Sequence, residues 1–202
     1  SCSHTYDDPS TNSVKLTVTV GAASASLTRA DYINVSPNTM FVRAASTTAA
    51  YPYMTWETAA SNLATAVGIA ATGSRIIVSN GTDTAAASFN VPFGAVVEGL
   101  TGNPDDVVIN MDGRYNYVMN DPDAVLSSVK IVFGSAAMGG GVRIGHLGGT
   151  LTNCIVANCY VAEYDCQGGG VLAQGAKSLV THCVVTNCTV WGEGDYEGEK
   201  AC

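Results

Sequence analysis

The sequence predicts an all-β protein whose main part is a right-handed parallel β-helix, and the first reason is a repeated unit. The stretch GGGVRIGHLGGTLTNCIVANCYV begins at Gly139, and the related stretch GGGVLAQGAKSLVTHCVVTNCTV begins at Gly168. The two align without a gap at an offset of 29 residues. A period in this range is typical of solenoids, in which each unit buries its apolar face against its neighbours.

The residue types in the repeat are the second reason, because they favour strands over helices. Short apolar runs rich in β-branched residues and Cys alternate with Gly or Asn, a pattern of strands joined by turns. A leucine-rich repeat would need Leu at fixed spacing and a longer helical half, and the repeat has neither. Charged residues make up only 13% of the chain, and its many small residues suit tight, stacked turns. We therefore expect a β-helix over residues 37–202, with 29-residue repeats from position 139 onward.

Residues 1–36 predict a β-hairpin. Apolar residues alternate with polar ones over residues 14–20, Gly21-Ala22 interrupts the pattern, and a second strand is expected over residues 26–35. Because an isolated hairpin is marginal in water and exposes its edges, either the strands that precede it were lost from this chain or it completes a sheet against another surface. The alternative is an ordinary hairpin packed on the solenoid.

The hairpin sequence resembles the last part of a polycystic-kidney-disease (PKD) domain, an immunoglobulin-like sandwich. The resemblance rests on His4 and Tyr6, on the alternating residues 14–20, and on the DYINV run at residues 31–35. It covers a third to a half of such a domain. It implies that the chain belongs to a large multidomain extracellular protein.

Residues 55–71 predict an amphipathic helix that caps the first coil. Trp56, Leu63 and Val67 recur at spacings of three, four or seven residues together with several Ala residues, which gives one apolar face. Thr55 is a suitable N-cap, and Gly73 is a suitable stop. A β-helix needs such a cover because an open end exposes core side chains and unpaired backbone.

Short strand-like segments separated by turn residues fill the middle of the chain. They are expected at residues 75–78, 87–91, 95–98, 106–110, 115–119 and 125–133. This order, with the helix and the GGGV…NC units, resembles the pectate-lyase-like β-helix superfamily. The nearest likeness is to secreted and surface β-helix proteins related to the chlamydial polymorphic outer-membrane proteins. The resemblance runs over residues 37–202 and implies a secreted or cell-surface location.

The repeat also predicts stacked side chains. The expected ladders place Cys154 next to Cys183, Cys159 next to Cys188, and Asn158 next to Asn187. Free buried thiols, disulfides and a four-thiolate zinc site all remain open for the cysteine ladders. Cys166 and Cys202 are candidates for a disulfide between loops, and Cys2 is left over for a bond to another chain. His182 aligns with Asn153, so it is expected at a hydrogen-bonding ladder position.

Asp105, Asp106 and Asp112 are weak calcium candidates. Pectate lyases hold calcium with stacked Asp residues, and the resemblance implies the same here. However, these residues lie in turn motifs, NPDD and MDG, where Asp is favoured for backbone reasons alone. With nine Lys and Arg residues the chain shows no basic cleft for a uronate polymer. We therefore predict no catalytic residue and no cofactor, with weak calcium binding at these residues as the alternative.

These observations favour a non-enzymatic extracellular structural or adhesive protein, self-assembling into fibres or displayed on a surface. Its expected partners are further copies of itself or neighbouring domains of a larger surface protein. The alternatives are a fragment of a polysaccharide lyase or hydrolase, and a carbohydrate-binding module. That module would use the surface aromatics Tyr51, Tyr53, Tyr160, Tyr164 and Trp191.

Two classes of partner are not expected from the composition. The net charge of −8 argues against binding to nucleic acid. No window of about 18 apolar residues occurs, so no membrane span is predicted. The spacing of Cys188 and Cys202 places the last residues where a further coil would begin, and we expect that end to be a truncation or an assembly surface.

Overall fold

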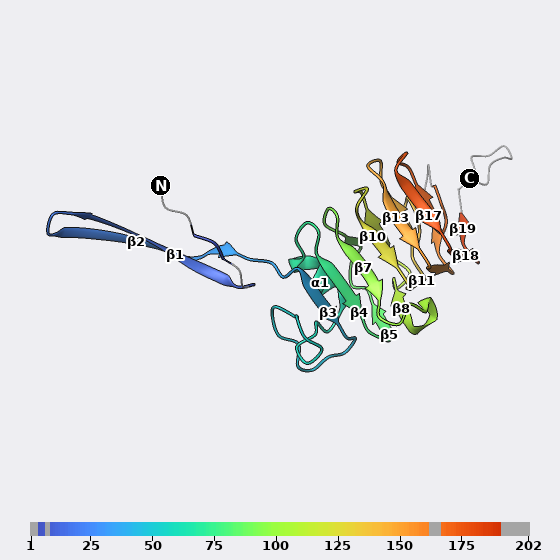
Figure 1. Ribbon diagram of the computed structural model, residues 1–202. Helices are drawn as coiled ribbons and strands as arrows, with labels where there is room; N and C mark the ends of the chain where they lie inside the picture. Colours follow the sequence, from blue (N-terminus) through green and yellow to red (C-terminus); the bar gives the residue numbers. More distant parts are fainter. Residues whose placement is uncertain (1–3, 7–8, 162–166, 191–202) are drawn as a thin grey trace.

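A computed structural model of the chain describes residues 4–6, 9–161 and 167–190 (Figure 1). Most of the described residues form a β-solenoid of parallel strands with very little helix, which confirms the predicted parallel β-helix. A two-stranded antiparallel hairpin precedes the solenoid and projects away from it. Among the described residues, no helix is long and apolar enough to cross a membrane.

Three parallel sheets form the walls of the solenoid. The first sheet contains, in order, β3 (Thr39–Val42), β4 (Arg75–Val78), β7 (Val96–Gly99), β10 (Val125–Ser127), β13 (Gly149–Thr152) and β17 (Ser178–Thr181). The second contains β5 (Gly81–Thr84), β8 (Val107–Asn110), β11 (Lys130–Val132), β14 (Ile155–Ala157) and β18 (Val184–Thr186). The third contains β6 (Phe89–Asn90), β9 (Tyr117–Met119), β12 (Val142–Ile144) and β16 (Val171–Ala173). A further parallel pair joins β15 (Tyr160–Val161) to β19 (Thr189–Val190).

One strand from each sheet makes one coil, and the described residues contain about four coils. Register partners in the first sheet show how long each coil is. Val96 pairs with Val125, and Thr150 pairs with Leu179, so both of these coils take 29 residues. Val125 pairs with Thr150 after only 25 residues. Differences in length are therefore absorbed between strands, while the strands themselves stay in register.

Inward-facing side chains of successive coils stack into columns that form the core. Met40, Ile76, Val97, Leu126 and Leu151 are consecutive partners along the first sheet, and all are fully buried. Parallel strands lie about 4.8 Å apart, so each side chain packs on the equivalent one of the next coil. The core is a continuous apolar rod rather than a single cluster between two layers.

Single residues in the left-handed backbone region make two of the corners between strands. Between the first and second sheets, Asn153 and His182 have φ of 50° and 53°. At the end of the second sheet, Asn158 and Asn187 have φ of 55° and 50°. Asn tolerates this conformation better than most residues. The recurring Asn and His residues of the repeat are therefore corner residues.

The same geometry corrects two predictions in the middle of the chain. Residues 125–133 were expected to form one strand, but Ser128 adopts φ 57° and divides the segment into β10 and β11. No strand was expected between residues 78 and 87, but β5 begins at Gly81 and pairs in parallel with β8. Local sequence signals missed both because pairing with neighbouring coils determines where these strands begin and end.

The predicted helix over residues 55–71 is also corrected, because α1 covers only Leu63–Ile69. Asn62 is the N-cap, and its side-chain oxygen accepts a 2.8 Å hydrogen bond from the Thr65 amide. The preceding residues form bends and an isolated bridge instead of a helix, because Ala60 pairs in parallel with Val42 and exchanges backbone hydrogen bonds with Phe41 and Arg43. The apolar spacing in residues 56–60 therefore reflects packing against β3 rather than a helical face.

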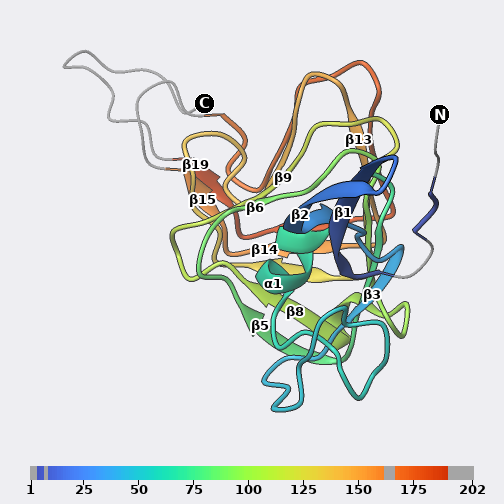
Figure 2. The same ribbon diagram turned by 90° about the vertical axis from the view of Figure 1, so that its left-hand side faces the viewer.

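Helix α1 packs on the coils through Leu63 and Ala66, which are fully buried. It contacts β3, β4 and β6. Viewed from the side that carries the hairpin, α1 lies within the outline of the coils (Figure 2). Asp83 of β5 occupies an inward position of the second sheet, and its carboxylate accepts a hydrogen bond from the Leu63 amide. The first coil thus has a polar group where later coils have Ile or Val.

The hairpin consists of β1 (Thr11–Val20) and β2 (Ala23–Asn34), joined at Gly21-Ala22. Gly21 has φ 61°, the conformation that favours glycine in a two-residue hairpin loop. At the base of the hairpin, the rings of His4 and Tyr6 meet edge to face at 4.5 Å. The two strands extend away from the coils instead of lying along them (Figure 1). In this structure the hairpin is therefore not packed along the solenoid.

Candidate functional site

The two-stranded ribbon formed by β1 and β2 has one apolar face and one polar face. Residues directly opposite each other in an antiparallel pair point to the same side. The apolar face is made by the pairs Val14–Arg29, Leu16–Leu27, Val18–Ala25 and Val20–Ala23. The polar face is made by the pairs Lys15–Thr28, Thr17–Ser26 and Thr19–Ser24. This division is what a strand pair shows when one side is covered by another layer.

The apolar face is largely open to solvent in the described structure. Leu16, Val18, Val20 and Leu27 are each between 55% and 75% exposed. Covering one such side chain would stabilise the protein by about 1–2 kcal/mol, since complete burial of Val or Leu is worth about 1.5–3 kcal/mol. Contiguous exposed apolar patches of this kind mark interaction surfaces.

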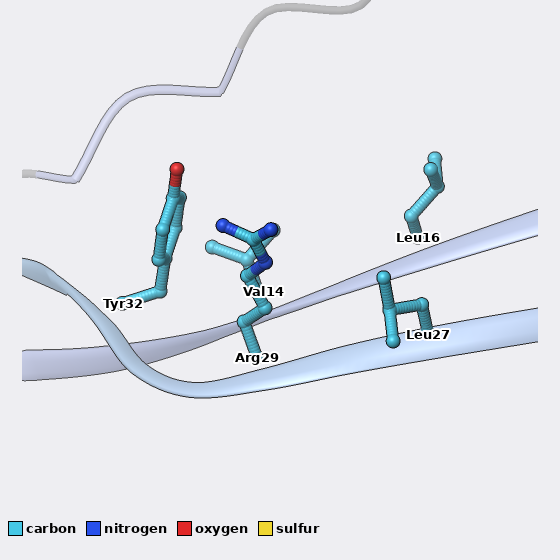
Figure 3. Close-up of a pocket in the computed structure, with 5 residues that line it drawn as sticks. All are labelled: Val14, Leu16, Leu27, Arg29 and Tyr32. Carbon is cyan, nitrogen blue, oxygen red and sulfur yellow. The ribbon is translucent and has the colours of Figure 1, made fainter.

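A groove lies on the apolar face near the base of the ribbon (Figure 3). Its volume is about 340 Å³, and it is lined by Val14, Leu16, Leu27, Arg29 and Tyr32. The guanidinium carbon of Arg29 lies 5.0 Å from the centre of the Tyr32 ring, which is a cation–π contact. Within residues 4–6, 9–161 and 167–190, no carboxylate forms an ion pair with Arg29.

An irregularity in the ribbon brings Tyr32 to this face. The register of the strand pair shifts between Asn12 and Val14, and Asp31 has φ 50°. The Asp31 amide donates a 3.2 Å hydrogen bond to the Ser13 hydroxyl, which holds the irregular residue in place. Strict alternation would put residue 31 beside Arg29, but the shift places Tyr32 there. The sequence pattern of alternating residues did not reveal this aromatic group in the site.

The three calcium candidates are engaged by neighbouring side chains. Asp105 forms an ion pair of 2.9 Å with Lys130, and Asp112 pairs with Arg114. Asp106 accepts hydrogen bonds from Thr101 at 2.7 Å and from Asn103 at 3.1 Å. Asp105 and Asp106 belong to the short 3-10 turn η1 (Pro104–Asp106). In the described part of the chain, no three His, Cys, Asp or Glu residues gather into a group that could hold a metal ion.

The cysteines of the repeat are free thiols placed one coil apart. Cys154 and Cys159 are buried, while Cys183 and Cys188 are half-buried. The Cys154 thiol donates to the Thr152 carbonyl at 3.2 Å. Burial raises the pKa of Cys154 and of Cys159 to about 12, so both are protonated at neutral pH and poor nucleophiles. The positions suit apolar filling of the core.

The amide and imidazole positions of the repeat stabilise corners. The Asn187 side chain donates to the side-chain oxygen of Asn158. The Asn153 amide nitrogen donates to the Gly102 carbonyl at 2.7 Å and to the Ser128 hydroxyl at 3.1 Å. His182 shares a 2.8 Å hydrogen bond with the Thr181 hydroxyl. Cys2, Cys166 and Cys202, with the aromatics Tyr164 and Trp191, lie outside the described residues.

The remaining aromatic candidates lie outside the groove on the ribbon, and two of them donate hydrogen bonds to backbone carbonyls. The Tyr51 hydroxyl donates to the Val35 carbonyl at 3.0 Å, and the Tyr160 hydroxyl donates to the Gly113 carbonyl at 3.1 Å. Tyr53 lies beside Tyr51, with ring centres 6.3 Å apart. A second, smaller groove of about 200 Å³ was not expected from the sequence. It is lined by Asn90, Val91, Pro92, Phe93, Val118 and Asn120.

Two buried polar groups were also missed. Tyr117 is fully buried, and its hydroxyl has no hydrogen-bond partner within the described residues. Burial raises the pKa of Tyr117 well above its ordinary value. Burial likewise raises the pKa of Asp83, although the hydrogen bond from Leu63 opposes this rise. No sequence signal marks either residue, because Tyr117 lies in a segment that reads as an ordinary strand and Asp83 lies in one where no strand was expected.

Comparison with known proteins adds no family: no family, curated protein or solved structure matches this chain.

Proposed function

We propose that this chain is a secreted or cell-surface structural or adhesive protein in which a rigid β-helix carries a projecting β-ribbon. The observation that carries the proposal is the apolar face of the ribbon, held away from the coils with four large side chains more than half exposed. A solenoid is suited to such a role, because stacking coils extends it along one axis with little internal freedom. The ribbon then joins the solenoid to a neighbouring module or to another copy.

The finer features of the fold belong to the same proposal. We take the coils to be right-handed, since parallel strand crossovers are right-handed in nearly all proteins. Helix α1 is proposed as the N-terminal cap, supported by its burial against β3 and β4 and by the hydrogen bond from Leu63 to Asp83. The pectate-lyase-like and PKD affinities rest on the sequence resemblances alone.

The enzyme alternatives receive less support from the described residues. Hydrolysis of a glycoside by this kind of fold needs two carboxyl groups about 5–9.5 Å apart and free to act. The acidic residues singled out by the sequence instead pair with Lys130 and Arg114 or accept hydrogen bonds within a turn. Fold likeness to polysaccharide lyases does not establish their activity.

Electron microscopy of the purified chain, with and without reductant, tests the structural role. We expect ordered assemblies or fibres with a regular axial repeat. Comparing the two redox conditions shows whether the cysteines outside the described residues, Cys2, Cys166 and Cys202, take part. Dispersed single molecules under all conditions, together with cleavage of a polysaccharide in a substrate screen, would contradict the proposal and favour the enzyme alternative.

A further inference from the structure

We propose that the apolar faces of two ribbons pack against each other in an antiparallel, face-to-face homodimer. This inference deepens the structural role proposed above, because it names one contact through which copies of the chain associate. It rests on how large and small side chains are distributed along the ribbon, on the position of its single charged group and on the area available.

Side-chain size changes along the apolar face. The half near the base contains the bulky residues Val14, Leu16, Leu27 and Arg29, with Tyr32 beside them. The half near the turn contains the pairs Val18–Ala25 and Val20–Ala23. The base half is thick and the turn half is thin, so the face is not complementary to a flat surface.

A two-fold axis across the middle of the ribbon makes this shape self-complementary. Such an axis lays β1 over β1 of the second copy and β2 over β2, with the strand directions reversed. Leu27 of each copy then faces Ala25 of the other, and Leu16 faces Val18. Large residues opposite small ones are how packed layers interdigitate. Packing the ribbons with their strands in the same direction would instead put bulky pairs against bulky pairs and leave a gap at the turns.

The charge on the face favours the same orientation. Arg29 is the only ionisable side chain among the four residue pairs of the apolar face. In the antiparallel arrangement the two Arg29 residues lie at opposite ends, about 20 Å apart along the strands for six residues of extended chain. That separation exceeds the Debye length of about 8–10 Å at physiological ionic strength. With parallel ribbons the two guanidinium groups would be separated by little more than the spacing of the layers, about 10 Å.

The area sets the expected strength of the dimer. Five large side chains, the four exposed aliphatic residues and Tyr32, each expose 55% or more of their surface. If each contributes on the order of 100 Å², the two copies together bury about 1,000 Å², the lower limit for a specific interface. We therefore expect a reversible dimer that dissociates in the micromolar range. Because the ribbons project away from the coils, the two solenoids would lie at opposite ends of the dimer (Figure 1).

Sedimentation equilibrium of the full chain in reductant, from about 1 to 500 µM, tests the dimer. Reductant removes any contribution from intermolecular disulfides. The wild-type chain should show a concentration-dependent monomer–dimer equilibrium. Leu16→Lys, which puts a charge in the apolar face, should raise the dissociation constant of the dimer about 100-fold or more. The matched control Thr17→Lys adds the same charge to the polar face of the same strand, and its dissociation constant should stay within about threefold of the wild-type value.

A swap of two side chains tests the antiparallel packing itself. Leu27→Ala opens a gap opposite Ala25 of the other copy, and Ala25→Leu creates a clash with Leu27 of the other copy. Each single variant should raise the dissociation constant of the dimer about tenfold or more. The double variant keeps the composition and restores a large residue opposite a small one, so it should return to within about threefold of wild type. Hydrogen exchange of the amides of β1 and β2 checks that the ribbon is formed in each variant.

The results that would overturn the proposal are distinct from failure of the structural role. A wild-type chain that stays monomeric at every concentration, or a dimer that survives Leu16→Lys, means that another partner covers the apolar face or that another surface associates. Failure of the double variant to recover, with its ribbon intact, overturns the antiparallel packing. Fibres seen by electron microscopy in the Leu16→Lys variant would leave the structural role standing without this contact.

Discussion

At the scale of single residues, two polar groups inside the coils set how the first and middle coils respond to pH and substitution. Asp83 and Tyr117 are both buried in columns that are otherwise apolar. Asp83 has a partner, the amide of Leu63, whereas the Tyr117 hydroxyl has none within the described residues. An unpaired buried polar group costs more than a paired one, so the two residues should behave differently when replaced.

Ionisation of the buried Asp83 carboxyl should destabilise the wild-type protein as the pH rises, and Asp83→Asn should remove this loss. Burial raises the pKa of Asp83 in the folded protein above its value in the unfolded chain. The stabilising effect of the neutral carboxyl is therefore complete below the unfolded pKa and is lost as the pH rises through the folded pKa. Asn cannot ionise, but its side-chain oxygen can still accept from the Leu63 amide. Urea unfolding from acid to neutral pH should show the stability of the variant, relative to wild type, rising with pH. A difference that is constant with pH, or that falls, contradicts this assignment.

Tyr117→Phe should leave the protein as stable as wild type or more stable by about 1 kcal/mol. The substitution removes a hydroxyl without a partner and keeps the ring, which lies 6.3 Å from the ring of Phe89. Chemical denaturation of both proteins under the same buffer conditions measures the difference. A loss of more than about 1 kcal/mol would show that the hydroxyl is hydrogen-bonded in solution, for example to an internal water.

At the scale of elements, the repeat determines register, while corner residues and pairing with neighbouring coils together determine where strands end. The gapless 29-residue alignment correctly predicted that Val142 is the partner of Val171, and it matches the pairing of β14 with β18. Neither the helix bounds nor the division of residues 125–133 could be predicted in this way. Ala60 pairs with a strand rather than joining a helix, and Ser128 turns the chain without a Gly or Pro to mark it.

Substitution at Asn158 separates backbone conformation from the amide ladder. Asn158→Gly keeps a residue that adopts positive φ readily and loses only the hydrogen bond from Asn187. Asn158→Val loses the same bond and also forces a β-branched residue into the left-handed region. We expect Asn158→Val to be less stable than Asn158→Gly by about 1–2 kcal/mol. Thermal or urea unfolding of the pair gives this difference directly, and equal stabilities would show that the corner relaxes to another conformation.

At the scale of the whole molecule, the protein is an axial stack with apolar side chains exposed in the last described strands and on the ribbon. Two equivalent residues of the repeat show that the sequence predicts which positions stack, but not which of them are buried. The alignment relates Leu151 to Val180 as equivalent positions, yet Leu151 is fully buried and Val180 is 41% exposed. Equivalence in sequence describes what a residue contacts within the stack, but not whether a neighbouring coil covers it. The ribbon is a second case. The alternation of apolar and polar residues along its strands indicates that one face is covered, but it does not show which surface covers that face.

Because Leu151 is buried and Val180 is partly exposed, truncating each to Ala should reduce the stability of the protein by different amounts. Leu151 packs between the partners Leu126 and Val180, so Leu151→Ala should cost about 2–5 kcal/mol through lost burial and a cavity. Val180→Ala removes fewer atoms from a half-covered site and should cost less than about 1 kcal/mol. Because each coil in a solenoid is stabilised mainly by its neighbours, Leu151→Ala should also increase hydrogen exchange in both β10 and β17, while Val180→Ala should affect β17 and β13 alone. Equal losses for the two variants would mean that Val180 is covered in solution, by a further coil or by another copy, and would extend the axial stack beyond the described residues.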